Sequence, residues 1–68
     1  MKISARNVFK GKIVEVTKGA TTAHVKIDIG GIVVTSSITN AAVEDLKLAA
    51  GKQASAIIKA SDVMIGID

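Results

Sequence analysis

Two short segments, one near each end of the chain, combine a positive charge with small hydrogen-bonding residues. They are Ser4-Ala5-Arg6-Asn7 and Lys59-Ala60-Ser61-Asp62. In each segment a hydroxyl and several backbone N–H donors accompany a cation, and the alanine leaves the backbone accessible. A tetrahedral oxyanion requires donors that converge on its oxygens together with some opposing charge. Both segments fit an oxyanion site, although a serine beside a lysine at a strand end is also typical of a solvated turn.

Side chains suited to catalysis are few. The chain has no cysteine to act as a nucleophile, and its single histidine, His24, falls on the polar face of an alternating strand. Glu44 and Asp45 are adjacent on a short predicted helix, so they point in different directions and make a poor acid–base pair. Neither a Walker-type glycine loop nor a dinucleotide-binding fingerprint occurs. We therefore expect no enzyme activity, no cofactor and no bare metal ion.

The composition favours a small β-domain that depends on a partner chain. Of the 68 residues 49% are apolar, yet Phe9 is the only aromatic residue. The apolar content is mainly Val, Ile and Ala, and the β-branched members favour strands. A chain this short buries only about 60% of the surface that its unfolded state exposes, and without cysteine it has no disulfides. Because excess aliphatic surface marks an interface, we expect one domain, residues 1–68, in a homo-oligomer.

The positive charge also allows a nucleic-acid partner. Nine Lys and Arg against six Asp and Glu give a net charge of +3, which attracts anions of any size. The charges are scattered, however, and the chain lacks the Tyr and Trp that stack on bases. The N-terminus has no signal-peptide pattern, and no run approaches the roughly 20 apolar residues that span a bilayer. We expect a cytoplasmic protein without nucleic-acid or membrane partners.

A long first strand is predicted over residues 3–17. Gly11 lies inside it, and an isolated glycine in a strand often marks a bulge or a close backbone approach. The adjacent apolar residues Ile13 and Val14 break the alternation in the same region. Lys18-Gly19 is then typical of a turn.

A β-hairpin follows. Residues 22–29 alternate cleanly, with the apolar side chains at the odd positions from Ala23 to Ile29, which predicts a half-buried strand. Gly30-Gly31 can adopt the positive φ angles of a tight hairpin connection. The third strand is predicted over residues 32–38.

One short helix and two further strands complete the predicted fold. Thr39 or Asn40 can cap a helix of about two turns that contains residues 41–46. Strands are predicted over residues 53–59 and 63–67. The fold class is therefore all-β with one short helix, as a five-stranded Greek-key barrel of the oligonucleotide/oligosaccharide-binding type. Adjacent apolar residues place aliphatic groups on both strand faces, so the outward-facing set needs cover from another subunit.

The motifs of the chain also have a recognisable order. The first set is Ser4-Ala5-Arg6-Asn7, Gly11, Val25 and Gly30-Gly31; the second is Ile38-Thr39, Ala42, Leu46 and Gly51; the third is Lys59-Ala60-Ser61-Asp62-Val63-Met64. This order resembles the molbindin family, small molybdenum-pterin-binding proteins whose domain also occurs in molybdate transporter ATPases and a molybdate-responsive repressor. The resemblance covers essentially the whole chain. One departure is Ala54, where bulkier aliphatic residues are common in the family, and it concerns packing more than the site.

The resemblance implies a barrel assembled as a hexamer, a trimer of dimers, that holds molybdate or tungstate between subunits for storage, buffering or delivery. The positions that it implies for the oxyanion site are Ser4, Arg6, Asn7, Thr39, Lys59, Ala60 and Ser61. Ala60 can contribute only its backbone, and Arg6 can contribute its main chain while its side chain pairs elsewhere. Two alternatives remain. A nucleic-acid-binding barrel of the same fold type predicts strongly salt-dependent binding to oligonucleotides, and a ligand-free oligomerisation module predicts the same oligomer without a response to oxyanions.

Overall fold

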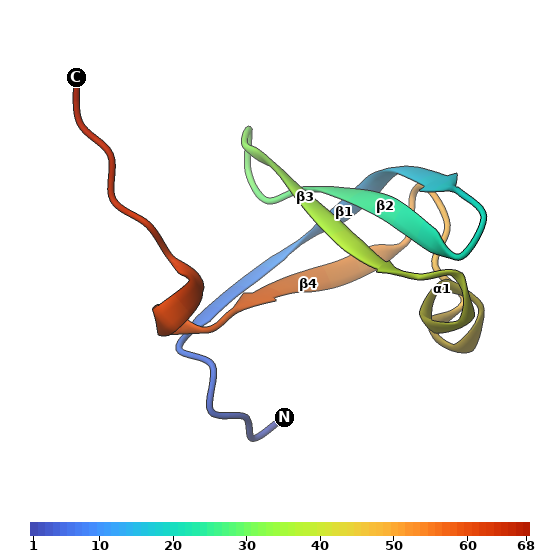
Figure 1. The fold of residues 1–68 in the computed structure, drawn as a ribbon, viewed down its shortest axis with the longest axis horizontal. Helices are drawn as coiled ribbons and strands as arrows, with labels where there is room; N and C mark the ends of the chain where they lie inside the picture. The colour runs from blue at the N-terminus through green and yellow to red at the C-terminus, as the bar shows by residue number, and fades with distance from the viewer.

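The computed structural model describes all 68 residues and contains a curled antiparallel sheet with one short helix at one end (Figure 1). The strand order across the sheet is β3-β2-β1-β4. The elements are β1 (Asn7–Lys18), β2 (Thr22–Asp28), β3 (Val33–Thr39), α1 (Asn40–Leu46), β4 (Gln53–Ile58) and a single 3-10 turn (Ala60–Asp62). The predicted class, mostly β with one short helix, is confirmed.

The core lies on the concave side of this sheet. Ala23, Val25 and Ile27 of β2 are buried, whereas the residues between them are exposed, so the predicted alternation is correct. Six buried residues form the core cluster, and they are Ile13, Ala23, Val25, Ile27, Val43 and Ala56. The burial of these small aliphatic side chains from four different elements supplies the main hydrophobic stabilisation of the fold.

β1 bends at the positions where its sequence breaks the alternation. The β1–β2 register shifts between Ile13 and Glu15, which leaves Val14 as the extra residue of a bulge. At Gly11 a Cβ atom would lie 2.3 Å from the backbone oxygen of Asp28. Only glycine therefore allows β2 to approach β1 this closely, and both sequence predictions for this strand are confirmed.

Both ends of α1 are fixed by hydrogen bonds. The hydroxyl of Thr39 accepts a bond of 3.0 Å from the backbone N–H of Ala42, so Thr39 is the N-cap. At the other end Lys47 takes a left-handed conformation with φ of 53°. The ammonium group of Lys52 donates to the carbonyls of Leu46 and Lys47 at 2.8 and 3.1 Å. α1 thereby closes the end of the sheet at which β3 finishes.

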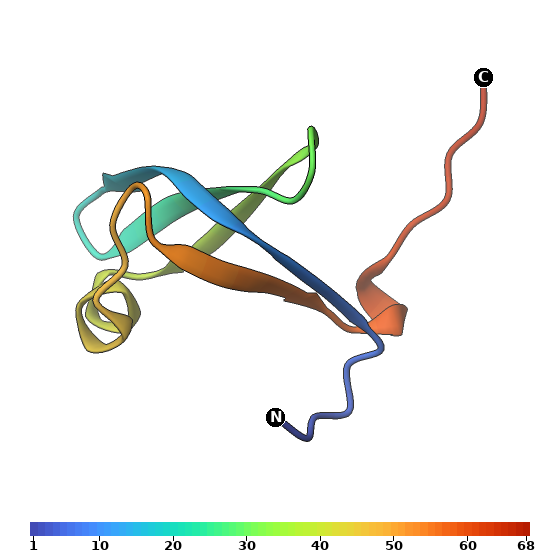
Figure 2. The ribbon, with the colours of Figure 1, turned by 180° about the vertical axis from the view of Figure 1, so that it is seen from behind.

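The prediction of five strands is wrong for the single chain, which has four. β1 begins at Asn7 and not at residue 3, and residues 63–68 form no strand. This C-terminal tail, defined here as residues 63–68, extends away from the sheet in both views (Figures 1 and 2). Local alternation shows that a segment suits a strand, but a strand also needs a neighbour to pair with, and the tail pairs with no strand of its own chain.

A single copy leaves most of its aliphatic surface in solvent. Only seven of the 68 residues are buried, and thirteen large hydrophobic side chains are exposed. The concave face of the sheet opens into an apolar groove of about 740 Å³ between β3 and β4. No helix has the length and apolar character needed to cross a membrane.

Candidate functional site

The antiparallel pairing of β1 with β4 brings the two predicted oxyanion segments together. Asn7, the first residue of β1, lies opposite Ile58, the last residue of β4. Ser4 and Arg6 immediately precede Asn7, and Lys59 immediately follows Ile58. Segments about fifty residues apart in sequence therefore meet at the end of the sheet remote from α1 (Figure 1).

A side-chain hydrogen bond links the two segments. Asn7 is half-buried, and its Nδ2 donates to the backbone oxygen of Ile58 at 3.1 Å. The oxygen of Ile58 and the N–H of Lys59 belong to one planar peptide group. Asn7 therefore holds the direction in which the Lys59 N–H points. Ala5 is buried between the exposed Ser4 and Arg6, so its side chain anchors the N-terminal segment.

The C-terminal segment exposes backbone donors at the start of the 3-10 turn. The N–H of Asp62 bonds to the oxygen of Lys59 at 2.9 Å, and the N–H of Val63 bonds to the oxygen of Ala60 at 3.3 Å. The first N–H groups of a helical turn have no partner within it, and no side chain caps this turn. The N–H groups of Ala60 and Ser61 therefore have no partner within the turn, and the hydroxyl of Ser61 belongs to the same short segment.

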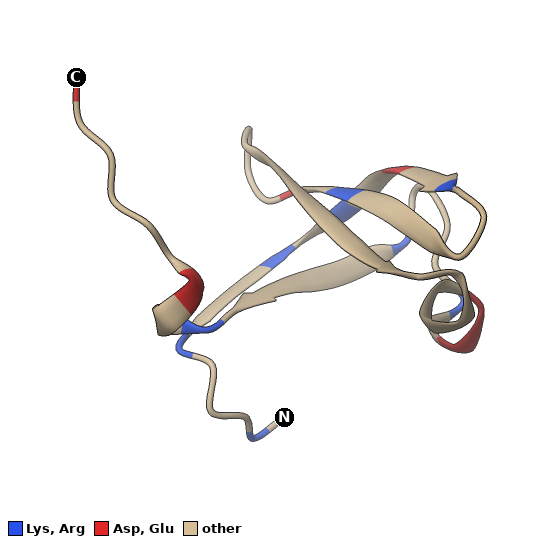
Figure 3. Ribbon diagram, in the orientation of Figure 1, with Lys and Arg blue, Asp and Glu red and all other residues tan.

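Positive side chains flank these donors. Lys and Arg lie both at the start of β1 and just after β4, next to an acidic residue in the 3-10 turn (Figure 3). The ion pairs of the chain join Lys18 to Glu44 and Lys26 to Glu15. Arg6 and Lys59 take part in neither, so both cations are available to an anion.

Thr39 is the one predicted site residue that lies elsewhere. It pairs with Thr22 across β3 and β2, at the end of the sheet where α1 begins, and its hydroxyl oxygen caps that helix. One copy of the chain therefore unites Ser4, Arg6 and Asn7 with the Lys59 segment but keeps Thr39 apart from them.

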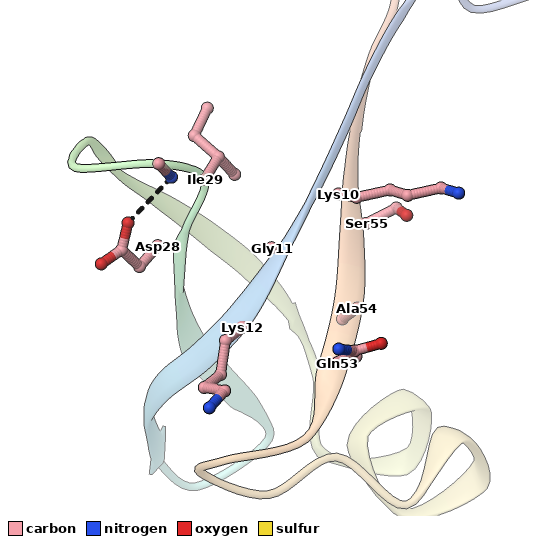
Figure 4. A pocket seen from close by; sticks show the side chains of 9 residues that line it. Lys10, Gly11, Lys12, Asp28, Ile29, Gln53, Ala54 and Ser55 are labelled. Carbon is pink, nitrogen blue, oxygen red and sulfur yellow. Dashed lines mark hydrogen bonds between the residues drawn. The ribbon is translucent and has the colours of Figure 1, made fainter.

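A second recess, which the sequence did not indicate, lies where β2 separates from β1. Its volume is about 620 Å³, and its lining includes Lys10, Lys12 and Asp28. The two lysine side chains point in different directions and do not converge on a common point (Figure 4). Asp28 accepts bonds from the N–H groups of Gly31 and Gly30 at 2.8 and 3.0 Å, and these bonds, that of Gly31 foremost, lower the pKa of its carboxyl. The bonds to Asp28 therefore belong to a structural turn. The recess offers no set of donors that converge on one ligand.

Other titratable residues form no further site. His24 is exposed on β2, as its alternation predicted. Glu44 pairs with Lys18 and so joins α1 to the end of β1. The chain contains no group of three His, Asp or Glu side chains that could hold a metal ion.

Comparison with known proteins identifies the family. Residues 3–65 match the model of the TOBE domain. The chain belongs to the TOBE domain family. This TOBE domain is 54% identical to a probable molybdenum-pterin-binding protein of Haemophilus influenzae over 69 residues, which cover 100% of both chains. The resemblance to the molbindins that the sequence motifs indicated is thereby confirmed.

Solved structures match the fold closely. MopII from Clostridium pasteurianum, in an apo form, has a TM-score of 0.91 and 45% sequence identity, covering 97% of this chain and 100% of that one. ModG, described as a cytoplasmic molybdate-binding protein and solved with molybdate bound, has a TM-score of 0.96 and 40% identity. That match covers 100% of this chain and 49% of the ModG chain. The names of ModG and of the Haemophilus influenzae relative refer to binding of molybdate and of a molybdenum-pterin, respectively.

Proposed function

We propose that this TOBE domain binds molybdate or tungstate reversibly, catalyses no reaction, and serves storage, buffering or delivery of the oxyanion in the cytoplasm. The observation that carries the proposal is the Asn7–Ile58 pairing, which joins two donor segments of matching chemistry at one end of the sheet. The names of the relatives and the molybdate bound to ModG support the ligand class.

The donor set suits a tetrahedral dianion. Ser4 and Ser61 can donate through their hydroxyls, Ala60 through its backbone N–H, and Arg6 and Lys59 can offset the negative charge. Binding removes water from both ion and donors, and that cost is offset only when several donors replace the lost hydrogen bonds. Sulfate has the same charge and shape but is smaller, so discrimination depends on the spacing of the donors.

We propose further that the ion lies between copies of the chain. Within one copy the donor segments are exposed on one side, and Thr39 lies at the opposite end of the sheet. A second copy can bring its Thr39 to the Ser4 and Lys59 segments and shield the ion from water. The whole chain, residues 1–68, then acts as one domain of a homo-oligomer, for which the molbindin resemblance implies a hexamer.

Isothermal titration of the purified protein with molybdate tests this function, with sulfate as the matched control and light scattering to size the oligomer first. We expect saturable molybdate binding by a multimer and little heat from sulfate. Absence of heat, together with absence of thermal stabilisation by molybdate or tungstate, would overturn the proposal and leave a ligand-free oligomerisation module. Titration with an oligonucleotide at low salt then separates that module from a nucleic-acid binder.

A further inference from the structure

The hydroxyl group of Thr39 has a donor that its own chain leaves unused. Its oxygen accepts the bond from the N–H of Ala42, and a hydroxyl also carries one hydrogen that it can donate. No hydrogen bond within the chain uses that hydrogen, and Thr39 is exposed. The bond from Ala42 fixes the side chain, so the place of the hydroxyl depends on how the backbone at Thr39 is held.

Asn40, the next residue, ties this backbone to the turn between β1 and β2. Its N–H donates to the oxygen of Thr21 at 2.8 Å, and its Nδ2 donates to the oxygen of Gly19 at 3.0 Å. The turn is itself closed, because the N–H of Gly19 donates to the oxygen of Thr22 at 2.7 Å. The carbonyl of Thr39 and the N–H of Asn40 belong to one planar peptide group. The two bonds from Asn40 therefore hold that peptide plane against the turn.

A second contact braces the same turn but is weaker. Lys18, at the end of β1, pairs with Glu44 of α1, and the two side chains are 45% and 67% exposed. Ion pairs this open to solvent contribute little, because water screens their charges. Asn40 is half-buried, so its bonds are better shielded. Asn40 is therefore the main polar link between α1 and the β1–β2 turn, which lie side by side in both views (Figures 1 and 2).

The side chain of Asn40 also carries an energetic cost. Its Oδ1 is buried and has no hydrogen-bond partner in the chain. A buried acceptor without a partner lowers stability by about as much as one net hydrogen bond raises it. The bond from Nδ2 to Gly19 therefore adds little net stability, and folding alone does not account for an asparagine at this position.

We propose that Asn40 is a positioning residue for the oxyanion site. By holding the peptide between Thr39 and Asn40 against the β1–β2 turn, it keeps the Thr39 hydroxyl where its free hydrogen meets an oxygen of the bound ion. The inference rests on the proposed function, in which Thr39 belongs to that site. A hydrogen bond to an anion is charge-assisted and depends on its geometry, and a donor aligned in advance need not be ordered on binding. Asn40 does not touch the ion, because its Nδ2 is bound to Gly19 and its Oδ1 is buried.

The first test separates positioning from stability. Asn40→Leu keeps a similar volume and removes both the donor and the unpaired acceptor. We expect it to weaken molybdate binding by about threefold to tenfold and to leave the urea midpoint of unfolding nearly unchanged. Lys52→Met is the control, since Lys52 donates to carbonyls at the other end of α1; it should lower the midpoint and leave the affinity unchanged. A loss of affinity in both variants, or in neither, would overturn the proposal.

The second test asks whether Asn40 acts through Thr39. In a Thr39→Ala background the hydroxyl is absent, so adding Asn40→Leu should cause no further loss of molybdate affinity. Residues that act independently give losses that add. Titration of the two single variants and the double variant measures the coupling, and additive losses would show that Asn40 does not position Thr39.

The third test uses the wild-type chain, so it does not depend on how a variant folds. We expect the N–H of Asn40 to be protected from hydrogen exchange equally with and without molybdate, because the turn is already held before the ion binds. Protection that arises only on binding would mean that the ion orders the turn, and the proposal would be wrong. Wild-type protein that binds no molybdate would overturn the proposed function and this role together, whereas normal wild-type binding with an unaffected Asn40→Leu variant would overturn this role alone.

Discussion

The side chain of Asn7 donates a hydrogen bond to the backbone oxygen of Ile58 at 3.1 Å, so one half of the candidate site orients a peptide group of the other half. The residues are 51 positions apart in sequence, and the bond lies at the last rung of the β1–β4 ladder. Because the Ile58 oxygen and the Lys59 N–H share a peptide plane, Asn7 acts on the site through the backbone of Lys59.

Replacing Asn7 by leucine keeps the side-chain volume similar but removes the donor. We expect Asn7→Leu to weaken molybdate binding by about tenfold, the equivalent of one net hydrogen bond, and Asn7→Gln to weaken it less. Titration gives the affinity, and the ¹H–¹⁵N shift of the Lys59 amide in the ligand-free protein reports its orientation. An unmoved amide and an unchanged affinity in Asn7→Leu would show that this bond is dispensable.

Lys59 and His24 make a matched pair of exposed residues at different places in the fold, one just after β4 and one on β2. Lys59→Ala removes a charge-assisted donor, so we expect about tenfold to a hundredfold weaker molybdate binding with an unchanged oligomer mass. His24→Ala should alter neither quantity. Titration and light scattering measure both, and a loss of binding in His24→Ala would place the site on the outer face of β2.

Thr39 caps α1 through the bond from Ala42 to its hydroxyl. Thr39→Ala should lower the free energy of unfolding by about 1 kcal/mol, whereas Thr39→Ser retains the cap. Urea unfolding at fixed protein concentration measures the difference. Titration of Thr39→Asn, which can still cap the helix but has no hydroxyl, separates the cap from any part that Thr39 plays in holding the ion. If the alanine and serine variants are equally stable, the cap contributes nothing.

Much of the fold could be predicted because its signals are local. Three signals depend only on residues close in sequence, and all three lie where they were expected. They are the alternation from Ala23 to Ile27, the glycine pair at the hairpin and the capping threonine. The prediction of a fifth strand was wrong because strand pairing depends on residues that are distant in sequence. The tail has the apolar pattern of a strand, but strand formation also requires pairing with another strand, which a local pattern does not report.

The same distinction applies to the site. Ser4, Arg6 and Lys59 were chosen by residue type, and the pairing of β1 with β4 brings their segments together. The bond from Asn7 to Ile58 could not be foreseen, because it depends on the register of two distant strands. Thr39 was grouped with them by resemblance alone, and a single chain does not bring it to the others.

Gly11 provides a test of the close approach between β1 and β2. An added methyl group would lie 2.3 Å from the oxygen of Asp28 and 2.9 Å from Cγ2 of Ile27. We expect Gly11→Ala to lower the free energy of unfolding by about 1–3 kcal/mol. Gly66→Ala is the control, since nothing lies within 4 Å of that position in the chain. Denaturant unfolding of both variants gives the comparison, and equal stability would show that the strands can separate at little cost.

The Asp28 carboxylate should make the β2–β3 turn sensitive to acid. Bonds from the N–H groups of Gly31 and Gly30 hold its pKa below the ordinary range. Its contribution to stability is therefore complete above about pH 4, near the pKa of an unfolded aspartate, and is lost as the pH falls through the lowered value. Asp28→Asn should remove this part of the pH dependence. Thermal unfolding of the two proteins between pH 2 and 6 should give curves that converge toward acid pH, and parallel curves would contradict the assignment.

The small number of buried residues has a consequence for how this chain tolerates change. Seven of 68 residues are buried in one copy. Exposure of a residue in one copy is therefore a poor guide to whether that residue can be substituted without effect. Because exposed aliphatic surface marks an interface, we expect selection to act also on exposed apolar positions such as Ile65 and Ile67. Neutral drift should instead concentrate on the charged outer face of the sheet, around Lys12 and Lys26.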